Sequence, residues 1–196
     1  MKKFLTFLTF LSIILSSVSK VHSIEADIFV QSTVNRASEA LNDKFSKEEK
    51  IEKLKEIASE TVDIKGIGFY TLGAYRKSIS DDQIKQYETL FKQYFLKSFT
   101  SRLAEYSNPE IEVVSKKKLN ENYTMVTSIL VSTEQRPKVK IDWRVYTKNS
   151  ENPLIRDLII EGLSLARTQK EEFSSIIQSN DGDINALFST LKEFVK

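Results

Sequence analysis

The sequence contains no cysteine and a single histidine, His22, in 196 residues. A chain without cysteine forms no disulfide, has no thiol nucleophile and lacks the ligands of most structural zinc and iron sites. The histidine lies near the N-terminus, in a segment that we expect to be removed from the mature protein. Thiol-dependent and histidine-dependent catalysis are therefore excluded, and we expect neither a metal site nor a cofactor.

Long hydrophobic runs are also missing, apart from Phe4 to Val18. This run follows the basic pair Lys2-Lys3 and precedes Val21-His22-Ser23, which has small or permissive residues at the −3 and −1 positions of a signal cleavage site. It is shorter than the roughly 20 apolar residues that span a bilayer. We therefore predict a signal peptide at residues 1–23 and a single exported domain at 24–196 that is soluble after export.

Neither sign of charge dominates the composition. The full chain has 29 basic and 27 acidic residues. Removing the signal peptide takes away Lys2, Lys3 and Lys20 but no acid, which leaves 26 basic against 27 acidic residues and a net charge of −1. A nucleic-acid-binding protein needs a net basic surface to replace the counterions of the phosphates. We therefore expect no nucleic-acid partner.

The mature chain begins with helical patterns. Apolar residues repeat at intervals of three and four residues between 30 and 41, and again between 51 and 57. The second helix is expected to start at Ser46, because Ser46-Lys47-Glu48-Glu49 is a capping box that satisfies free amides of the first turn. The segment 62–76 holds three of the five glycines but lacks the Gly-Lys-Ser/Thr ending of a phosphate loop. We interpret it as a short helix broken at close-packed corners.

The longest predicted helix begins at a second capping box, Ser80-Asp81-Asp82-Gln83, and runs to about Tyr106, shortly before Pro109. It carries a wide stripe of aromatic and aliphatic residues. The stripe has two interpretations, the core face of a packed helix or part of the wall of an apolar cavity. Its members are Ile84, Tyr87, Phe91, Phe95, Phe99 and Leu103, widened by Leu90 and Tyr94.

After Pro109 the pattern changes to strands, which we expect at residues 111–118, 123–131, 139–147 and 154–160. The connections between them are short and polar, which favours an antiparallel meander. Two more helices close the chain, and the last is capped by Asp183. Helices that are separated in sequence from a meander indicate the α+β class. The predicted fold has a helical N-terminal half, a four-stranded twisted antiparallel meander and two C-terminal helices.

The stretch from Val139 to Phe173 joins this sheet to the first C-terminal helix. Alternate residues of its first strand, Val139 to Val145, are apolar and are expected to share one face. Gly162 marks the corner after the last strand, where we expect a positive φ or close packing of the helix on the sheet. The helix with Phe173 and Ile177 is then expected to return over that face or its neighbour. An apolar ligand would lie between the sheet and the helix.

Three substitutions test these expectations. Gly162→Val should destabilise the fold by a few kcal/mol. Val145→Asp should remove bound ligand more readily than it unfolds the protein, because a cavity wall tolerates a polar change better than a solid core. Leu54→Asp, at a core position, should do the reverse.

Catalytic groups are not evident in the pattern. Two Ser-x-x-Lys matches, beginning at Ser115 and Ser189, lie on a predicted solvated strand end and an exposed helix face. Asp157 and Glu161 flank an apolar strand end, so they are candidates for buried hydrogen-bonding anchors or for catalytic acids. Of these two roles the structural one is favoured, and we expect the protein not to be an enzyme.

Two blocks of the sequence resemble the MlaC family, also called toluene-tolerance auxiliary proteins. The run from Asp157 to Leu165, followed eight residues later by Phe173, is similar to that family's D-x-x-x-E-G-x-S-L…F signature. Asp63, the run Leu72-Gly73-Ala74-Tyr75-Arg76, Gln83 and the aromatic helix are similar to a second block. The chain departs from the pattern at two positions, with Pro153 in place of the usual tryptophan and Lys170 where arginine is common.

The resemblance implies a periplasmic carrier that holds a diacyl phospholipid in a cavity between a twisted sheet and helices. In that family the carrier shuttles lipid between an outer-membrane lipoprotein complex and an inner-membrane ABC transporter with an MCE-domain subunit, which maintains outer-membrane lipid asymmetry. Three alternatives stay open on the residues alone. They are a carrier of another apolar ligand such as a sterol-like lipid or an aromatic solvent, a non-enzymatic periplasmic adaptor, and a lipid-modifying enzyme.

The candidate ligand-binding residues are apolar and aromatic side chains from the glycine-containing segment, the aromatic helix, the strands and the first C-terminal helix. We expect them to line the cavity. They are Phe69, Leu72, Tyr75, Phe91, Phe95, Val126, Ile141, Trp143, Val145, Ile160, Leu163, Phe173 and Ile177.

Overall fold

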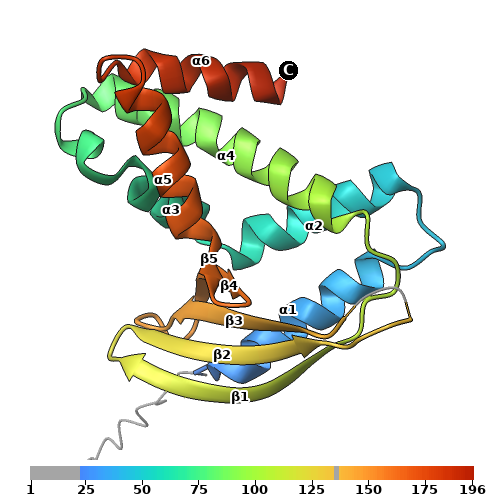
Figure 1. Cartoon of the computed structure of the whole chain (residues 1–196). Coiled ribbons are helices and arrows are strands. Elements are labelled where there is room, and N and C mark those ends of the chain that lie inside the picture. Colours follow the sequence, from blue (N-terminus) through green and yellow to red (C-terminus); the bar gives the residue numbers. More distant parts are fainter. Residues whose placement is uncertain (1–22, 135–136) are drawn as a thin grey trace, which may run out of the picture.

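The computed structural model of the chain describes residues 23–134 and 137–196 (Figure 1). All but the last residue of the predicted signal peptide, residues 1–23, lies outside this part, so the signal stays a prediction. Among the described residues, no helix combines the length and the apolar character that a membrane crossing needs.

Helices form the N-terminal half, as predicted. Both predicted capping boxes are present, since the side chains of Ser46 and Ser80 accept hydrogen bonds from the amides of Glu49 and Gln83 and those side chains bond back. The segment 62–76 is a helix that ends at Gly73 and continues as a 3₁₀ turn, which confirms the broken helix. The elements are α1 (Ala26–Ala40), α2 (Lys47–Thr61), α3 (Ile64–Leu72), the 3₁₀ helix η1 (Gly73–Lys77) and α4 (Asp81–Leu103).

The strands form one antiparallel sheet with the order β1-β2-β3-β4-β5, which confirms the meander. The predicted sheet had four strands, and the structure adds a two-residue fifth strand just after Gly162. Two residues are too few for a period-two pattern to be visible, so the sequence contained no signal for it. The strands are β1 (Ile111–Asn120), β2 (Tyr123–Leu130), β3 (Val139–Tyr146), β4 (Leu154–Ile160) and β5 (Leu163–Ser164).

Two helices complete the chain, α5 (Leu165–Gln178) and α6 (Ile184–Val195). Asp183 caps α6, since its side chain accepts a hydrogen bond from the amide of Asn185. Figure 1 shows α3 to α6 stacked above the sheet and α1 beside the sheet at the bottom of the molecule. The α+β class and the order of helices, meander and C-terminal helices are as predicted.

One face of the sheet packs against α1. Val126 and Trp143 are paired across β2 and β3, and together with Val145 they form a buried cluster with Val30 and Val34 of α1. The helix that carries Phe173 was expected over this face or its neighbour, and the first of these two placements was wrong, because α1 covers this face. Alternation along a strand determines which residues share a face, but it does not determine which helix covers that face.

A second buried cluster lies among α3, α4, α5 and α6. In it Tyr87 and Phe91 of the aromatic stripe are at most 2% exposed, and both rings meet Phe173 edge-on with centroids 6.4 and 6.2 Å apart. For these two residues the stripe is a core face. We call α3 to α6 the helical half of the molecule, and the sheet together with α1 the sheet half. Val62 packs against both clusters, so it lies where these two halves meet.

The corner after β4 has the predicted positive φ. Gly162 has a φ of +85°, and Glu161 before it has a φ of +48°. A Cβ built on Gly162 would meet no atom within 4 Å, so the alternative reason for this glycine, close packing, does not apply. The corner requires a left-handed backbone and nothing more.

Gly162→Val is expected to lower the free energy of unfolding by about 1–2 kcal/mol, the usual cost of placing an L-residue in the left-handed region. Gly162→Asn should lose less, because asparagine tolerates this region. Chemical denaturation of both variants checks the prediction. An unchanged midpoint for Gly162→Val would show that the corner is unstrained.

Candidate functional site

A pocket of about 430 Å³ lies between the sheet and helices α3 and α5. We call it the sheet pocket. The resemblance implied a cavity between the sheet and the helices, and this pocket occupies that position. Its lining combines apolar side chains with two arginines and one buried carboxylate. The lining residues are Gly66, Ile67, Tyr70, Leu119, Asn120, Tyr123, Arg144, Arg156, Asp157 and Ala166.

A β-bulge aims one of these arginines at α3. In the pairing of β3 with β4, Arg144 lies opposite Asp157 and Val145 opposite Ile155, so Arg156 is the extra residue. Its Nε donates to Asp63 Oδ2 at 2.6 Å. Asp63 also caps α3, because its Oδ1 accepts from the amide of Gly66 at 2.8 Å. One carboxylate therefore joins the start of α3 to the sheet.

The same arginine is held on its other sides by aromatic residues. Arg156 Nη1 donates to the hydroxyl of Tyr123 at 2.8 Å, and the guanidinium lies 4.1 Å from the centroid of the Tyr146 ring. A guanidinium fixed by a carboxylate, a phenol and a ring face is a preorganised cation. The Arg156 guanidinium is therefore a polar group held at a fixed position in the wall of the sheet pocket.

Asp157 is a buried anchor, as the sequence favoured. It is 4% exposed, and its carboxylate accepts hydrogen bonds from Ser164 Oγ at 2.6 Å and from the amide of Ala166 at 3.1 Å. Ser164 in turn caps α5 by accepting from the amide of Arg167. These contacts tie β4 to the first turn of α5.

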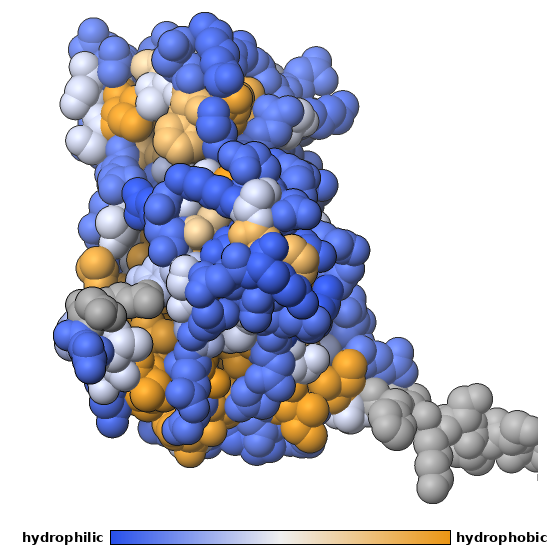
Figure 2. Space-filling view, turned by 90° about the vertical axis from the view of Figure 1, so that its right-hand side faces the viewer, coloured by the Kyte–Doolittle hydropathy of each residue, from blue (hydrophilic) through white to orange (hydrophobic). Residues whose placement is uncertain are grey.

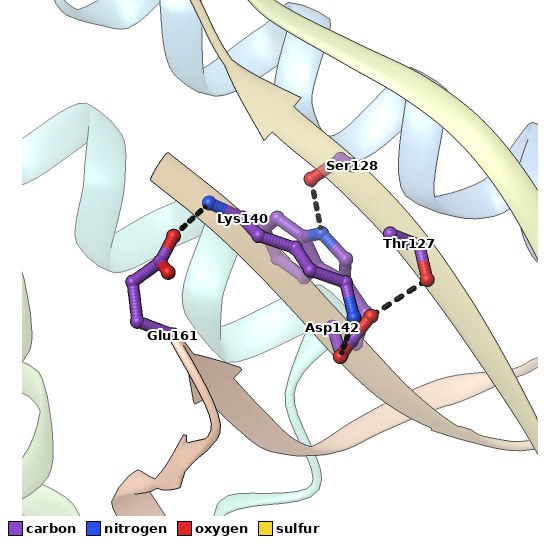
Figure 3. Close-up of polar contacts among 6 residues, drawn as sticks. Thr127, Ser128, Lys140, Asp142 and Glu161 are labelled. Atoms are coloured by element: carbon purple, nitrogen blue, oxygen red, sulfur yellow. Dashed lines mark hydrogen bonds and ion pairs between the residues drawn. The ribbon is translucent and has the colours of Figure 1, made fainter. Parts of the chain in front are cut away.

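Glu161 differs, because its side chain is exposed. Its carboxylate accepts a hydrogen bond from the backbone amide of Lys140 on β3 (Figure 3). Its role is therefore hydrogen bonding at the surface and not in the interior.

The two faces of the sheet carry different polar contacts. On the face toward α1, the Trp143 indole donates to Ser128 Oγ at 2.7 Å. On the opposite face, Asp142 accepts from Thr127 Oγ1 at 2.6 Å and from Lys140 Nζ at 2.9 Å (Figure 3). Burial raises the pKa of Asp142, but the hydrogen bonds from Thr127 and Lys140 and the charge of Lys140 outweigh it, so the pKa is lowered overall.

This shift predicts a pH-dependent contribution to stability. A carboxyl group whose pKa is lower in the folded state stabilises the fold above its ordinary pKa, and that contribution is lost as the pH falls through the lowered value. The difference in free energy of unfolding between the wild type and Asp142→Asn should therefore be largest near neutral pH and shrink in acid. Denaturation curves at several pH values measure it. A difference that grows toward low pH would contradict the assignment.

Each arginine that lines the sheet pocket has a carboxylate partner, although Asp63, the partner of Arg156, is not itself a lining residue. Arg156 pairs with Asp63, and Arg144 Nη1 lies 3.6 Å from Asp157 Oδ2 with its side chain 43% exposed. Tyr70, also 43% exposed, adds apolar surface. Such a site suits a ligand with an apolar body and a polar, overall neutral head. Among the described residues no group of three or more His, Cys, Asp or Glu side chains is arranged to hold a metal ion.

Most of the candidate ligand-binding residues named from the sequence lie in the two cores. None of them lines the sheet pocket. On the helical side, Leu72, Phe91, Phe173 and Ile177 are buried together, Tyr75 and Phe95 pack against them, and Phe69 is half-buried. On the sheet side, Val126, Trp143 and Val145 are buried under α1, Ile141 packs beside them, Ile160 is half-buried, and Leu163 is 60% exposed. Their contact with a ligand stays a prediction.

Sequence reasoning missed several residues of the sheet pocket, among them Tyr70, Leu119 and Arg144. Arg144 alternates with the apolar residues of its predicted strand, Leu119 follows the predicted end of the first strand at residue 118, and Tyr70 lies in the predicted broken helix, so none of the three stood out as a lining residue. One signal was available. Arg144 alternates with the apolar residues of β3 and faces the same way as the paired Asp157, so two opposite charges share one sheet face.

The structure shows where the two residues that depart from the family pattern, Pro153 and Lys170, lie. Lys170 lies with its Nζ 5.3 Å from the centroid of the Tyr70 ring, at the edge of the sheet pocket. Its Cε is also 3.0 Å from a Cβ built on Gly73, whose φ is +57°. Pro153 is buried immediately before β4. Lys170 thus supplies a cation beside the aromatic wall of the pocket.

Comparison with known proteins agrees with this architecture. The solved structure of the phospholipid-binding protein from Ralstonia solanacearum, in complex with a phospholipid, superposes with a TM-score of 0.73. The two sequences are 20% identical, and the match covers 88% of this chain and 97% of that one. The family model of the MlaC protein matches residues 31–193. Because this match spans most of the sequence, the chain belongs to the MlaC family.

Proposed function

We propose that this protein carries a diacyl phospholipid, with the acyl tails held between the sheet and helices α3 and α5. The observation that carries the proposal is the sheet pocket, which combines an apolar wall with two arginines, of which Arg156 is held by Asp63 and Tyr123. Membership of the MlaC family and the phospholipid in the Ralstonia solanacearum structure support it. A carrier needs no nucleophile or general base, which fits a chain whose histidine and cysteine content is so low.

The size of the pocket sets a requirement on the mechanism. A cavity of about 150 Å³ holds one benzene, or about 25 Å³ per carbon. Two acyl tails with roughly 30 methylenes then need about 750 Å³, more than the 430 Å³ of the sheet pocket. Loading therefore requires the sheet half and the helical half to move apart or to repack.

The contacts between the halves suit such a movement. Near the sheet pocket the joint is polar, consisting of the Asp63 and Arg156 pair and the bonds of Asp157 to Ser164 and Ala166. The two apolar clusters share only Val62 among their members in the described part of the chain. A third buried cluster, formed by Ala40, Leu41, Leu54 and Ala104, joins α1 to α2 and to the end of α4. The polar joint beside the sheet pocket is therefore the place where the halves separate with the least exposure of apolar surface.

The energetic need for a carrier is large. Exposure of two acyl tails to water costs on the order of 20 kcal/mol at about 0.8 kcal/mol per methylene. The family supports a periplasmic location and exchange of lipid between an outer-membrane lipoprotein complex and the MCE-domain subunit of an inner-membrane ABC transporter. In this proposal the exchange maintains the lipid asymmetry of the outer membrane.

Tyr70→Asp tests the site. The side chain is 43% exposed and lines the sheet pocket, so the fold should tolerate a carboxylate while the acyl tails lose contact with the wall. We expect the phospholipid taken up from vesicles to fall about tenfold, equivalent to ~1.4 kcal/mol. Lipid phosphorus per folded protein, with circular dichroism as the folding check, gives the result.

Val114→Asp is the matched control. Val114 is 54% exposed on β1 and lies outside the lining of the sheet pocket, so this variant adds the same charge without touching the site. It should keep the wild-type lipid load. Equal loads for Tyr70→Asp and Val114→Asp would place the lipid elsewhere in the molecule.

A further inference from the structure

A second pocket, of about 390 Å³, lies among the C-terminal half of α4, α5 and α6. We call it the helix pocket. It shares no lining residue with the sheet pocket. Figure 2 shows hydrophobic side chains at the top of the molecule, at the height of α6, and a larger group around the sheet, with mostly hydrophilic residues and a few small hydrophobic patches between them. The helix pocket is therefore a separate site on the helical half.

The wall of the helix pocket is aromatic. The Tyr94 ring lies with its centroid 4.8 Å from that of Phe194 and 5.7 Å from that of Phe173, and Ile176 and Leu191 complete the apolar lining. Phe194 is 44% exposed, so it forms a rim. The hydroxyl of Tyr94 donates to Gln169 at 2.8 Å, so the one phenol in the wall is already satisfied.

Two cations stand at the edge of this wall. Lys97 and Arg102 both line the pocket, and in the part of the chain that the structure describes neither has a carboxylate partner. Lys97 Nζ lies 5.8 Å from the centroid of the Phe194 ring. The single acid of the lining, Glu172, accepts a hydrogen bond from Gln169. The rim thus carries a net charge of one positive unit.

We infer that the helix pocket binds one long-chain fatty acid, with the acyl chain along the aromatic wall and the carboxylate at Lys97 and Arg102. At about 25 Å³ per carbon, 390 Å³ accommodates roughly 16 carbons, which is one chain and not two. A carboxylate supplies the single negative charge that the rim lacks, and a guanidinium binds it in a bidentate manner. The ammonium of a zwitterionic head would instead meet two cations. The inference does not depend on the phospholipid site.

Isothermal titration calorimetry of delipidated mature protein with sodium palmitate tests the inference. We expect one palmitate per chain. Phe194→Asp, which places a carboxylate at the rim, and Arg102→Gln, which removes a cation from an exposed position, should each weaken binding at least tenfold. Hexadecanol, with the same chain length and no charge, should bind at least tenfold more weakly than palmitate.

Tyr70→Asp decides which pocket is being measured, since it alters only the sheet pocket. Palmitate affinity within twofold of wild type in this variant supports the inference. Four results would overturn it: no binding of palmitate, a loss in Tyr70→Asp without a loss in Phe194→Asp, equal affinity for hexadecanol, or tighter binding of a single-chain phosphatidylethanolamine. Arg102→Gln keeps the test decisive if Phe194→Asp fails to fold.

Discussion

Asp157→Ala is expected to lower the free energy of unfolding by about 3 kcal/mol, because it leaves two buried donors without an acceptor. The hydroxyl of Ser164 and the amide of Ala166 both donate to this carboxylate, and each unsatisfied buried group costs about 1–3 kcal/mol. The change also frees the cap of α5 from β4. Urea denaturation followed by circular dichroism measures the loss.

Glu161→Ala is the control for this substitution. Glu161 belongs to the same sequence block, but its side chain is exposed and accepts one hydrogen bond, from the amide of Lys140. Its loss should cost less than about 1 kcal/mol. Similar losses for the two alanine variants would mean that Asp157 does not join the strand to the helix in solution.

Val145→Asp is expected to prevent folding altogether. Val145 is 0% exposed and belongs to the cluster between the sheet and α1, so a carboxylate there is buried without a partner. That penalty is several kcal/mol, comparable with the 5–15 kcal/mol by which a typical domain is stable. The structure thus changes the result expected from the sequence, which treated this face as a cavity wall. Circular dichroism and the soluble yield of the variant report the outcome.

Two further variants serve as comparisons for Val145→Asp. Leu54→Asp, at a position that is 2% exposed, should also prevent folding, so the contrast first expected between Val145 and Leu54 disappears. Val114→Asp makes the same replacement at an exposed valine of β1 and should fold normally. A folded Val145→Asp that has lost its lipid would restore the cavity-wall interpretation.

Much of the fold could be predicted because its signals are local. Capping at Ser46, Ser80 and Asp183 depends on residues within three positions of each helix start, and those three starts were found. The first four strands were found within two residues of their ends, because period-two alternation is a property of a short segment. The positive φ at Gly162 also followed from a single residue.

The candidate site was harder to predict because its residues meet only after folding. Arg156 reaches Asp63 across 93 positions of sequence, through a bulge that no local pattern reveals. The choice of α1 as the cover of the Trp143 face depends on how the helices stack, which alternation does not encode. The resemblance placed the cavity between the sheet and the helices, but polar and half-exposed residues line the pocket found there.

Mass spectrometry of the ligand extracted from natively purified mature protein tests most directly whether the protein carries a diacyl phospholipid. We expect diacyl phospholipid in the extract, at a level that falls about tenfold in Tyr70→Asp and stays unchanged in Val114→Asp. Wild-type protein that contains no phospholipid and takes none from vesicles, or that yields a sterol-like or aromatic ligand instead, would contradict the proposal.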